Sequence, residues 1–394
     1  MSFLLKICGS EWNNASRDKR ELSVYRELGY DVLVMAKGAP GDWGRADMVD
    51  GVPVLRYSTR PLGKRVPNPV NRFVSLFQWA HAARSLQPDV ISGHDLVPGL
   101  TIAWLSALLQ KDKPKLIYDS HEFELGRNAK RSAFQREAIR LAERFLMRRC
   151  ALSIMVNDTI ADEVQRIHKL KDRPIVVRST PDNWPLDPNA IRQVREELMK
   201  NTETKTEPFL VMYHGAITTG RGIEMLIRVT AKDPHVRAIV LGNGGAAYLD
   251  SLKTLAAELG VADRVLFHPA VPLSELWKYV GAADLSLMMI EGKAKSYYYA
   301  LPNKFFESIQ SLTPIVASNF PEMQRLIDKY EIGLTCDPND LDAVCACIER
   351  MRTDKALYAQ CKENLKRAKA DLCWEKEKNV LKDAFERYIG KPEN

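Results

Sequence analysis

The chain lacks several features that would place it in a well-defined class of protein. None of its apolar runs reaches the roughly 18 residues that cross a bilayer, so no transmembrane helix is expected. The seven cysteines are odd in number and scattered, which argues against a disulfide framework or a cysteine metal cluster. Residues 1–9 form a short apolar pattern without the basic start or cleavage site of a signal peptide. We therefore expect a cytoplasmic protein.

A dinucleotide-binding motif is also missing. The first strand-like run ends in Cys8-Gly9-Ser10-Glu11 rather than in G-x-G-x-x-G, which weighs against an enzyme that uses NAD or FAD. Loops of the second half offer cations and backbone amides for an anionic ligand. A divalent ion is then not needed to hold that ligand, so we expect no metal and no cofactor.

Positive charge is unevenly distributed. The net charge is +7, yet residues 1–150 hold 24 lysines and arginines against 16 aspartates and glutamates, and the remainder holds 33 against 34. This asymmetry indicates an anionic partner for the first half, such as a membrane surface, a lipid phosphate or a nucleic acid. Aromatic residues are not interleaved with the basic clusters and no known module is present, so a nucleic acid is not expected.

Short β-rich segments alternate with helical patterns along the chain, which is typical of parallel sheets with crossover helices. The series occurs twice, so we predict an α/β protein with two Rossmann-like, doubly wound domains. The strands predicted in the first half are 3–8, 31–36, 53–57, 90–93, 116–119, 152–156 and 175–178. Those predicted in the second half are 209–214, 238–241, 265–268, 285–289, 315–317 and 333–335.

Composition indicates where the domains end. The stretch 179–208 is polar and rich in proline, and it contains a predicted helix at 189–200. We expect an N-terminal domain at 1–180, a linker region at 181–207, a C-terminal domain at 208–372 and a last helix at 373–394. Doubly wound domains bind ligands beyond the carboxyl ends of their strands, so the loops after the strands are the places to search.

Two loops of the first half carry a histidine beside carboxylates. Ser120-His121-Glu122-Phe123-Glu124 follows a predicted strand, and a histidine in that place can donate a hydrogen bond or relay a proton. A loop histidine that is satisfied by its neighbours is the alternative. His94 and Asp95 follow the preceding strand, and helix capping by Asp95 is sufficient to explain that pair.

The loops after the strands of the second half carry glycines. The strand at 209–214 leads into a turn at 215–222 that contains Gly215, Gly220 and one cation, Arg221, and such a turn suits a diphosphate. Gly242 and Asn243 belong to a tight loop against which a base or phosphate can pack. An ordinary turn explains either loop equally well.

The segment 298–308 is the most informative part of the chain. It follows one apolar strand and precedes another, and its order is polar loop, proline and short helix. It offers helix N-terminal amides, the cation Lys304 and the carboxylate Glu307 to one small ligand. The cation suits a phosphate and the carboxylate suits two sugar hydroxyls. A nucleotide-sugar carries both groups.

A basic stripe runs along one predicted helix of the first half. It consists of Arg136, Arg140, Arg144 and Arg148, four residues apart. A neighbouring apolar face consists of Phe134, Ala138, Leu141 and Phe145. A solvated outer face over a packed inner face is the commoner outcome for such a helix, and attachment to anionic lipid headgroups is the alternative.

Together these motifs resemble the GT-B glycosyltransferases of the large retaining family 4 group, which builds bacterial surface glycans. The resemblance covers nearly the whole chain. Its most specific part is Leu301-Pro302-Asn303-Lys304-x-x-Glu307, followed by Thr313-Pro314-Ile315-Val316-Ala317-Ser318. The other matching segments are Ser16-Arg17-Asp18, Asp119-Ser120-His121-Glu122, the turn at 215–222, Leu241-Gly242-Asn243-Gly244 and Trp374-Glu375.

The resemblance implies that the domain at 1–180 binds the acceptor and the domain at 208–372 binds the donor. It implies that the two domains face a central cleft, with the C-terminal helix crossing back to the first domain. On this interpretation Arg17, His94, Arg136 and Arg140 lie on the acceptor or membrane side. It implies that Glu307 holds the donor ribose, that His121 lies near the transferred sugar and that Arg221 replaces the usual diphosphate-binding lysine. With Lys304, which supplies charge, His121 and Arg221 form the expected catalytic set. The remaining donor contacts it implies are Gly215, Gly220, Gly242, Asn243, Tyr299, Leu301, Pro302 and Asn303.

This chain departs from the family pattern at two positions. Tyr299 stands where the family has the first glutamate of its Glu-x7-Glu motif, and Ala216 stands where it usually has an arginine. Both departures concern contacts with the donor. Lys304 offers the positive charge that the turn has lost.

The expected activity is transfer of a sugar, with retention, from a UDP- or GDP-sugar to a glycan or lipid-linked acceptor in surface polysaccharide or glycoconjugate synthesis. The departing phosphate takes the acceptor's proton, so no strong protein base is required. Two alternatives are a sugar-nucleotide epimerase or hydrolase with this fold, and a non-catalytic partner that keeps the fold. The protein is expected in a bacterial cytoplasm, with weak peripheral attachment to the inner face of the membrane.

Overall fold

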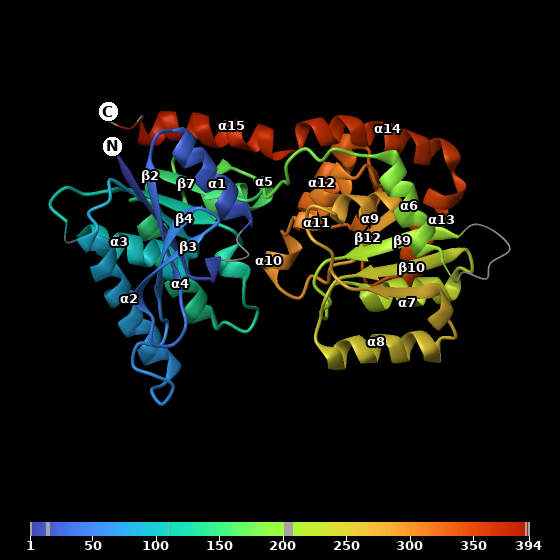
Figure 1. Ribbon diagram of the computed structural model, residues 1–394, viewed down its shortest axis with the longest axis horizontal. Coiled ribbons are helices and arrows are strands. Elements are labelled where there is room, and N and C mark those ends of the chain that lie inside the picture. The colour runs from blue at the N-terminus through green and yellow to red at the C-terminus, as the bar shows by residue number, and fades with distance from the viewer. Residues whose placement is uncertain (1, 13–15, 109, 201–207, 391, 393–394) are drawn as a thin grey trace. The chain divides into compact units, whose positions relative to one another are not determined.

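The computed structural model describes residues 2–12, 16–108, 110–200, 208–390 and 392, in two compact units (Figure 1). Unit 1 comprises residues 1–178 and 377–394, and unit 2 comprises residues 179–376. The region expected as a linker contains helix α6 (Pro188–Leu198), whose Val194 and Leu198 are buried against the sheet of unit 2. The charged end of that region, 201–207, lies outside the described residues.

Unit 1 is built on an eight-stranded sheet. Its strands are β1 (Phe3–Cys8), β2 (Asp31–Lys37), β3 (Trp43–Val49), β4 (Val52–Tyr57), β5 (Val90–His94), β6 (Lys115–Ser120), β7 (Leu152–Met155) and β8 (Ile175–Val176). They lie in the order β3-β4-β2-β1-β5-β6-β7-β8, and every neighbouring pair is parallel except β3 with β4. Strand β3 was not predicted, because this edge strand is largely exposed and carries no apolar run. The strand expected at 175–178 ends at Val176.

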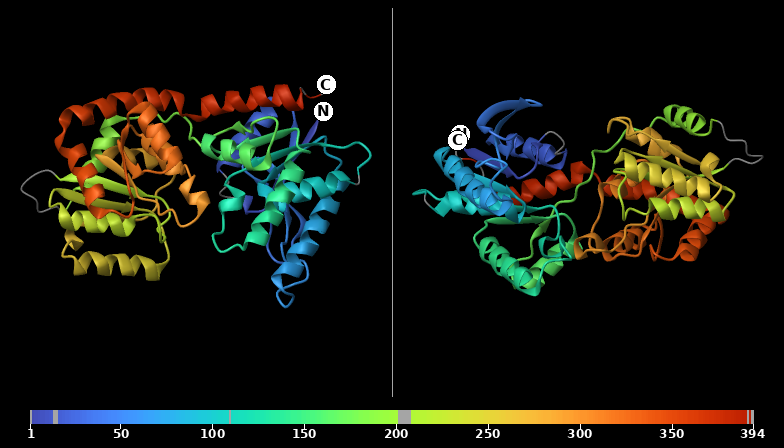
Figure 2. Two further views of the ribbon diagram at one scale, coloured as in Figure 1. Left: turned by 180° about the vertical axis from the view of Figure 1, so that it is seen from behind. Right: turned by 90° about the horizontal axis from the view of Figure 1, so that it is seen from below.

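Helices cover both faces of this sheet (Figure 2). They are α1 (Ser16–Glu27), α2 (Asn68–Ser85), α3 (Thr101–Leu108), α4 (Ala133–Met147) and α5 (Asp158–His168). Leu5 and Ile7 of β1 face α2 and α3, where Trp79 and Ala103 complete one core. Side chains alternate along a strand, so Lys6 points to the opposite face, toward α1.

Unit 2 has a six-stranded sheet that is parallel throughout. Its strands are β9 (Phe209–His214), β10 (Val236–Leu241), β11 (Val265–His268), β12 (Leu285–Met288), β13 (Ile315–Ser318) and β14 (Gly333–Cys336). They lie in the order β11-β10-β9-β12-β13-β14. The helices that follow α6 are α7 (Ile223–Lys232), α8 (Ala246–Glu258), α9 (Leu276–Ala282), α10 (Lys295–Tyr298), α11 (Asn303–Gln310), α12 (Pro321–Tyr330), α13 (Leu341–Thr353) and α14 (Lys355–Asp371).

Each sheet reverses its winding beside its first strand. In unit 1 the reversal lies between β1 and β5, and in unit 2 it lies between β9 and β12. Loops that leave two such strands at their carboxyl ends diverge to opposite faces and open a crevice, which is where doubly wound sheets bind ligands. The topology therefore predicts a site in each unit before any side chain is considered.

The last helix, α15 (Trp374–Ala384), begins in unit 2 and continues into unit 1 (Figure 1). Its extension packs the ring of Phe385 against Tyr25 of α1, with 4.7 Å between the ring centroids. Glu377 accepts hydrogen bonds from the backbone and side chain of Arg178 at 2.8 and 3.0 Å. The expected return of the C-terminal helix to the first domain is confirmed. In the described part of the chain, no helix has the length and apolar content needed to cross a bilayer.

Candidate active site

A fully buried lysine lies near the point where the sheet of unit 1 reverses. The Lys6 ammonium is 2.9 Å from Asp18, 2.7 Å from Glu21 and 2.8 Å from Asp119. Burial alone would lower the pKa of Lys6, but the three carboxylates raise it well above its ordinary value. Asp119 has the largest effect of the three. Lys6 is therefore a permanent cation at the centre of three anions.

Arg17 completes this cluster from the first turn of α1. Its Nε lies 2.9 Å from Glu21, and an Nη lies 3.1 Å from Asp119. The other Nη donates to the carbonyl of Val177 at 2.6 Å. The sequence assigned Arg17 to the acceptor side, whereas the structure places its guanidinium inside the unit. There it joins α1 to β6 and to the end of β8.

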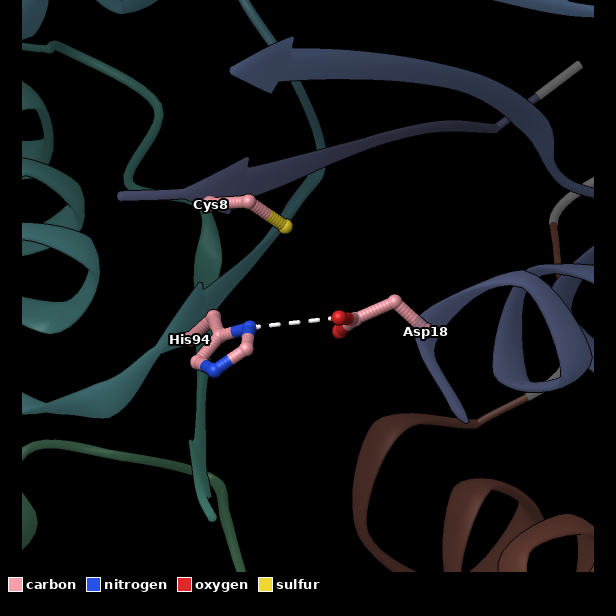
Figure 3. A group of neighbouring side chains, drawn as sticks. All are labelled: Cys8, Asp18 and His94. Carbon is pink, nitrogen blue, oxygen red and sulfur yellow. Dashed lines mark ion pairs between the residues drawn. The ribbon is translucent and has the colours of Figure 1, made fainter. Parts of the chain in front are cut away.

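The two loop histidines of unit 1 lie against each other. The ring centroids of His94 and His121 are 3.7 Å apart. Nε2 of His121 is 3.1 Å from Asp119, and its backbone N–H donates to Asp95 at 3.0 Å. Nδ1 of His94 is 3.3 Å from Asp18, as Figure 3 shows. Two residues that the sequence singled out separately therefore belong to one cluster.

A proton on His94 adds positive charge to this cluster. Among the described residues, the carboxyl groups of Asp18, Glu21 and Asp119 meet two fixed cations, Lys6 and Arg17, and burial raises the pKa of Glu21. Burial alone would lower the pKa of His94, but its hydrogen bond and ion pair with Asp18 raise it well above the ordinary value. The resulting imidazolium is a third cation, beside Asp18.

Cys8, Asp18 and His94 have side chains of the types that bind metal ions, and their ligand atoms lie within 4.8 Å of one another (Figure 3). Burial raises the pKa of the Cys8 thiol to about 11, so it is not a thiolate at neutral pH. Asp18 is already paired with the Lys6 ammonium. These residues therefore do not form a ready metal site.

In unit 2, glycines allow the loops after three strands to approach closely. Gly222, with φ +79°, precedes α7, and a Cβ there would lie 2.4 Å from the carbonyl oxygen of Met289. A Cβ on Gly242 would lie 1.9 Å from the carbonyl oxygen of Gly215. The backbone N–H of Ile217 donates to the carbonyl of Asn243 at 2.9 Å. The predicted glycine turns are thus packed together at the reversal of this sheet.

Glu307 extends from α11 toward the end of β9. Its Oε2 lies 3.1 Å from Nε2 of His214, and its side chain remains 16% exposed. The helix begins after Pro302, so its first amides are not used by the helix itself. The sequence did not single out His214. A histidine that ends an otherwise apolar strand at a sheet reversal is the signal that would have identified it.

Lys304 is the most unusual residue of unit 2. It is buried, and its Nζ has no hydrogen-bond partner among the described residues. The amine lies 3.9 Å from the centroid of the Tyr213 ring. Burial and then the nearby Arg221 guanidinium lower the pKa of Lys304 to about 7, against an opposing effect of Glu307. An amine so placed lacks only an anion.

The other predicted donor residues have varied surroundings. Arg221 lies 5.1 Å over the ring of Tyr297, and the Asn243 side chain accepts a hydrogen bond from the backbone of Ala270 at 3.1 Å. Leu301 packs against the core beside α11, and Asn303 is the first residue of that helix. The ring of Tyr299 contacts Tyr298 and Lys295. Gly220 has φ +76° in the loop after β9.

Arg136 and Arg140 lie on α4 and contact neighbours in the chain. Arg136 donates to the carbonyl of Arg131, and Arg140 pairs with Glu137. The apolar face expected beside them is exposed rather than packed, because the buried residues of α4 are Glu143, Leu146 and Met147. Phe134, Leu141 and Phe145 are 83%, 51% and 43% exposed.

Comparison with known proteins matches each half of the chain to a glycosyltransferase family. Residues 22–180 match the family "Glycosyl transferase 4-like domain", and residues 194–368 match the family "Glycosyl transferases group 1". The chain is a GT-B glycosyltransferase of the family 4 type. It is therefore an enzyme that transfers glycosyl groups.

Curated relatives of this glycosyltransferase are 24–29% identical to it over the parts that align. An uncharacterized glycosyltransferase of Methanocaldococcus jannaschii is 24% identical over 68% of this chain and 66% of its own length. The D-inositol 3-phosphate glycosyltransferase of Mycobacterium marinum is 27% identical over 60% of this chain and 50% of its own. A lipopolysaccharide core biosynthesis glycosyltransferase of Rhizobium meliloti is 29% identical over 41% of this chain and 44% of its own. The match thus spans from under half to about two thirds of these relatives.

Solved structures share the fold of this glycosyltransferase along its whole length. Sucrose-phosphate synthase of Thermosynechococcus elongatus gives a TM-score of 0.76 at 18% identity and covers 100% of both chains. HepE of Anabaena, solved in complex with UDP-glucose, gives a TM-score of 0.71 at 16% identity. The match covers 98% of this chain and 99% of the HepE chain. At these identities the likeness concerns the fold.

Proposed function

We propose that this glycosyltransferase moves a sugar from a UDP- or GDP-sugar to a hydroxyl group of a glycan or lipid-linked acceptor, with retention at the anomeric carbon. Its pathway is surface polysaccharide or glycoconjugate synthesis in a bacterial cytoplasm. One observation carries the proposal: Lys304 and Glu307 lie one helical turn apart at the reversal of the unit 2 sheet. The lipopolysaccharide core relative supports the pathway, and the UDP-glucose complex of HepE supports the class of donor.

Donor recognition divides between two kinds of group. The Glu307 carboxylate accepts hydrogen bonds from the ribose hydroxyls, and His214 orients it from β9. Lys304 and Arg221 face the diphosphate, together with the first amides of α11. A nucleoside diphosphate has its ribose hydroxyls at one place and its two phosphates at another. This arrangement matches a carboxylate, Glu307, that is separate from the cations Lys304 and Arg221.

The difficult step is departure of the nucleotide diphosphate, because the bond between the anomeric carbon and the phosphate oxygen breaks and leaves charge on that oxygen. Lys304 and Arg221 stabilise this charge without a metal ion. The departing phosphate oxygen accepts the proton of the acceptor hydroxyl, which attacks from the same face of the sugar. Retention follows from that shared face, and no protein base is needed.

Unit 1 recognises the acceptor. His121 is the more exposed of the two stacked histidines, with 21% of its side chain accessible against 14% for His94. Asp119 orients the His121 ring, so the imidazole presents a fixed edge to a sugar hydroxyl. The cluster around Lys6 holds that aspartate in place.

Turnover of UDP-glucose and of GDP-mannose, with and without glycan and lipid-linked acceptors, tests the proposal. We expect nucleotide release that depends on an acceptor and a product of unchanged anomeric configuration by NMR. Release without an acceptor identifies a hydrolase, and an isomerised sugar identifies an epimerase. An inverted linkage contradicts the mechanism, and no binding of either donor contradicts the placement of the site.

We also propose that this glycosyltransferase binds anionic membrane surfaces weakly through α4. The helix places Arg136 and Arg140 beside the exposed side chains of Phe134 and Leu141. Apolar residues beside arginines suit a headgroup layer, where each cation contributes about 1 kcal/mol. Lipid-linked acceptors are found at such a surface.

Liposome flotation tests this attachment. Recovery with anionic vesicles is expected at low salt and should fall as salt rises, because the Debye length shrinks. Leu141→Ser should reduce recovery, whereas Leu273→Ser, which changes a leucine of similar exposure in unit 2, should not. Equal recovery on neutral and anionic vesicles, or none at low salt, leaves α4 as an ordinary solvated helix.

A further inference from the structure

Lys304 differs from two half-buried lysines of unit 2, Lys362 and Lys369, in what its amine contacts. Burial also lowers the pKa of Lys362 and of Lys369. Lys362 nevertheless donates to the carbonyl of Leu312 at 2.7 Å, and Lys369 donates to that of Trp184 at 2.5 Å. Loss of solvent therefore does not by itself leave an amine without an acceptor. Lys304 is buried more deeply than either and has none among the described residues.

The groups that face Lys304 explain why a charge on it is unfavourable in the donor-free enzyme. The loop before α7 brings the Arg221 cation near, and like charges repel. Tyr213 from β9 offers only its ring, because its hydroxyl donates to the carbonyl of Ala216 and burial raises its pKa to about 12. Glu307, on the same helix, attracts the ammonium but has its Oε2 bound to His214.

We propose that Lys304 is a neutral amine in the donor-free enzyme and becomes an ammonium when the donor diphosphate binds, so that donor binding takes up one proton from solution. This inference rests on the proposed function. The amine nitrogen accepts a proton from the buffer, and the resulting N–H groups donate to phosphate oxygens. No other bond changes. The two phosphate charges outweigh the repulsion from Arg221 and supply acceptors that the described residues do not offer to this amine.

Donor affinity then depends on pH above neutrality. Below a pKa of about 7 the amine is already charged, and affinity is constant. Above it, a growing share of the enzyme must gain a proton in order to bind, so the dissociation constant rises about tenfold for each pH unit. An enzyme whose lysine is always charged lacks this dependence.

Titration calorimetry in buffers of different ionisation enthalpy measures the proton uptake directly. UDP-glucose and GDP-mannose are suitable probes, because the sugar esterifies the terminal phosphate and removes its ionisation near neutral pH. We expect uptake of about 0.9 proton at pH 8 and about 0.1 at pH 6 for an amine of this pKa. Lys304→Arg should abolish the uptake, since arginine stays charged, whereas Lys362→Met should retain it.

Two results overturn the inference while leaving the proposed function intact. One is donor binding without proton uptake at pH 8, and the other is equal uptake in the wild type and in Lys304→Arg. Lys304→Met serves in place of the arginine variant if that variant does not fold. NMR titration of the labelled lysine in the donor-free enzyme provides a test without any nucleotide, and titration of Lys304 above pH 9.5 contradicts the inference. Failure of both donors to bind contradicts the proposed function itself.

Discussion

The two units each bury a lysine near the reversal of their sheet, and they treat it in opposite ways. Lys6 of unit 1 meets three carboxylates within 2.9 Å. Lys304 of unit 2 meets an aromatic ring and, among the described residues, no hydrogen-bond partner. The first pKa is raised well above its ordinary value and the second is lowered to about 7. Burial acts on both in the same direction, so the difference comes from the neighbours.

This comparison separates a structural charge from a functional one. The Lys6 cluster is complete without a ligand, because its ions neutralise one another and orient His121 through Asp119. The amine of Lys304 has no hydrogen-bond partner among the described residues, and in our proposal the donor diphosphate supplies one. A buried polar group that has no partner is costly and persists where function requires it. The four predictions below test this contrast, from the largest expected effect to the smallest.

Lys6→Met should destabilise unit 1 strongly. Removal of the central cation leaves Asp18, Glu21 and Asp119 as buried carboxylates with too few counter-charges, at a cost of roughly 3–5 kcal/mol. Denaturant unfolding followed by tryptophan fluorescence measures the loss. A variant as stable as the wild type shows that the cluster is not needed to hold the fold of this unit.

Lys304→Met should have the opposite effect on stability. Because the folded-state pKa of about 7 lies below the unfolded value, the native state binds fewer protons between about pH 7 and pH 10.4. Wild-type stability therefore rises with pH across that window. The loss of stability caused by burying this amine is fully present below pH 7. The variant should gain roughly 2–4 kcal/mol at pH 6.5, and the gain should disappear toward pH 10.4.

Thermal and denaturant unfolding of wild type and Lys304→Met, from pH 6 to pH 10, measures this gain. Lys362→Met is the control, because its amine has a carbonyl partner that the substitution would leave unpaired. A stability difference between wild type and Lys304→Met that does not vary with pH contradicts the assignment of a neutral amine.

Glu307→Ala should weaken nucleotide binding without a large change in stability. The ribose hydroxyls lose a charged acceptor, which costs roughly 1.5–3 kcal/mol, or about 10- to 150-fold in the dissociation constant. Calorimetry with UDP and GDP measures it. Glu258→Ala, at an exposed position of α8, is the matched control. Unchanged affinity for both nucleotides shows that the ribose does not bind here.

Removal of divalent ions should have the smallest effect. Lys6 occupies the position among Asp18, Glu21 and Asp119 that a cation would take, and Lys304 and Arg221 supply charge for the diphosphate. Turnover is expected to be unchanged in EDTA. If activity is lost in EDTA and returns with Mn²⁺ or Mg²⁺, neither lysine replaces a metal ion as described.

Local patterns predicted most of the fold. The strands expected at 3–8, 209–214 and 265–268 have those bounds in the structure, because each is a short apolar run between polar turns. Strand β3 was missed, since an exposed edge strand has no such pattern. For α4 the sequence left open whether its apolar face is packed or exposed. Periodicity shows that a helix has two faces, but it does not show which face meets the core.

The residues of the unit 2 site were predictable because they lie close together in the sequence. Lys304 and Glu307 are separated by one turn of a helix that the pattern of proline and apolar residues indicates. The partner of Glu307, His214, lies 93 residues earlier, and only the parallel pairing of β9 with β12 brings the end of β9 near α11. Spacing along the chain carries no information about such a pair.

By itself the sequence determined the class of fold, the two-fold repetition of the α/β pattern and the loops that carry the site, because these depend on local periodicity and short motifs. Tertiary structure alone decided the state of the two lysines. Lys6 meets Asp119 across 113 residues, whereas Lys304 lies beside Tyr213 and Arg221 and finds no acceptor in the part of the chain that the structure describes. The charge of a buried amine depends on what surrounds it in space, and a sequence lists only its neighbours in the chain.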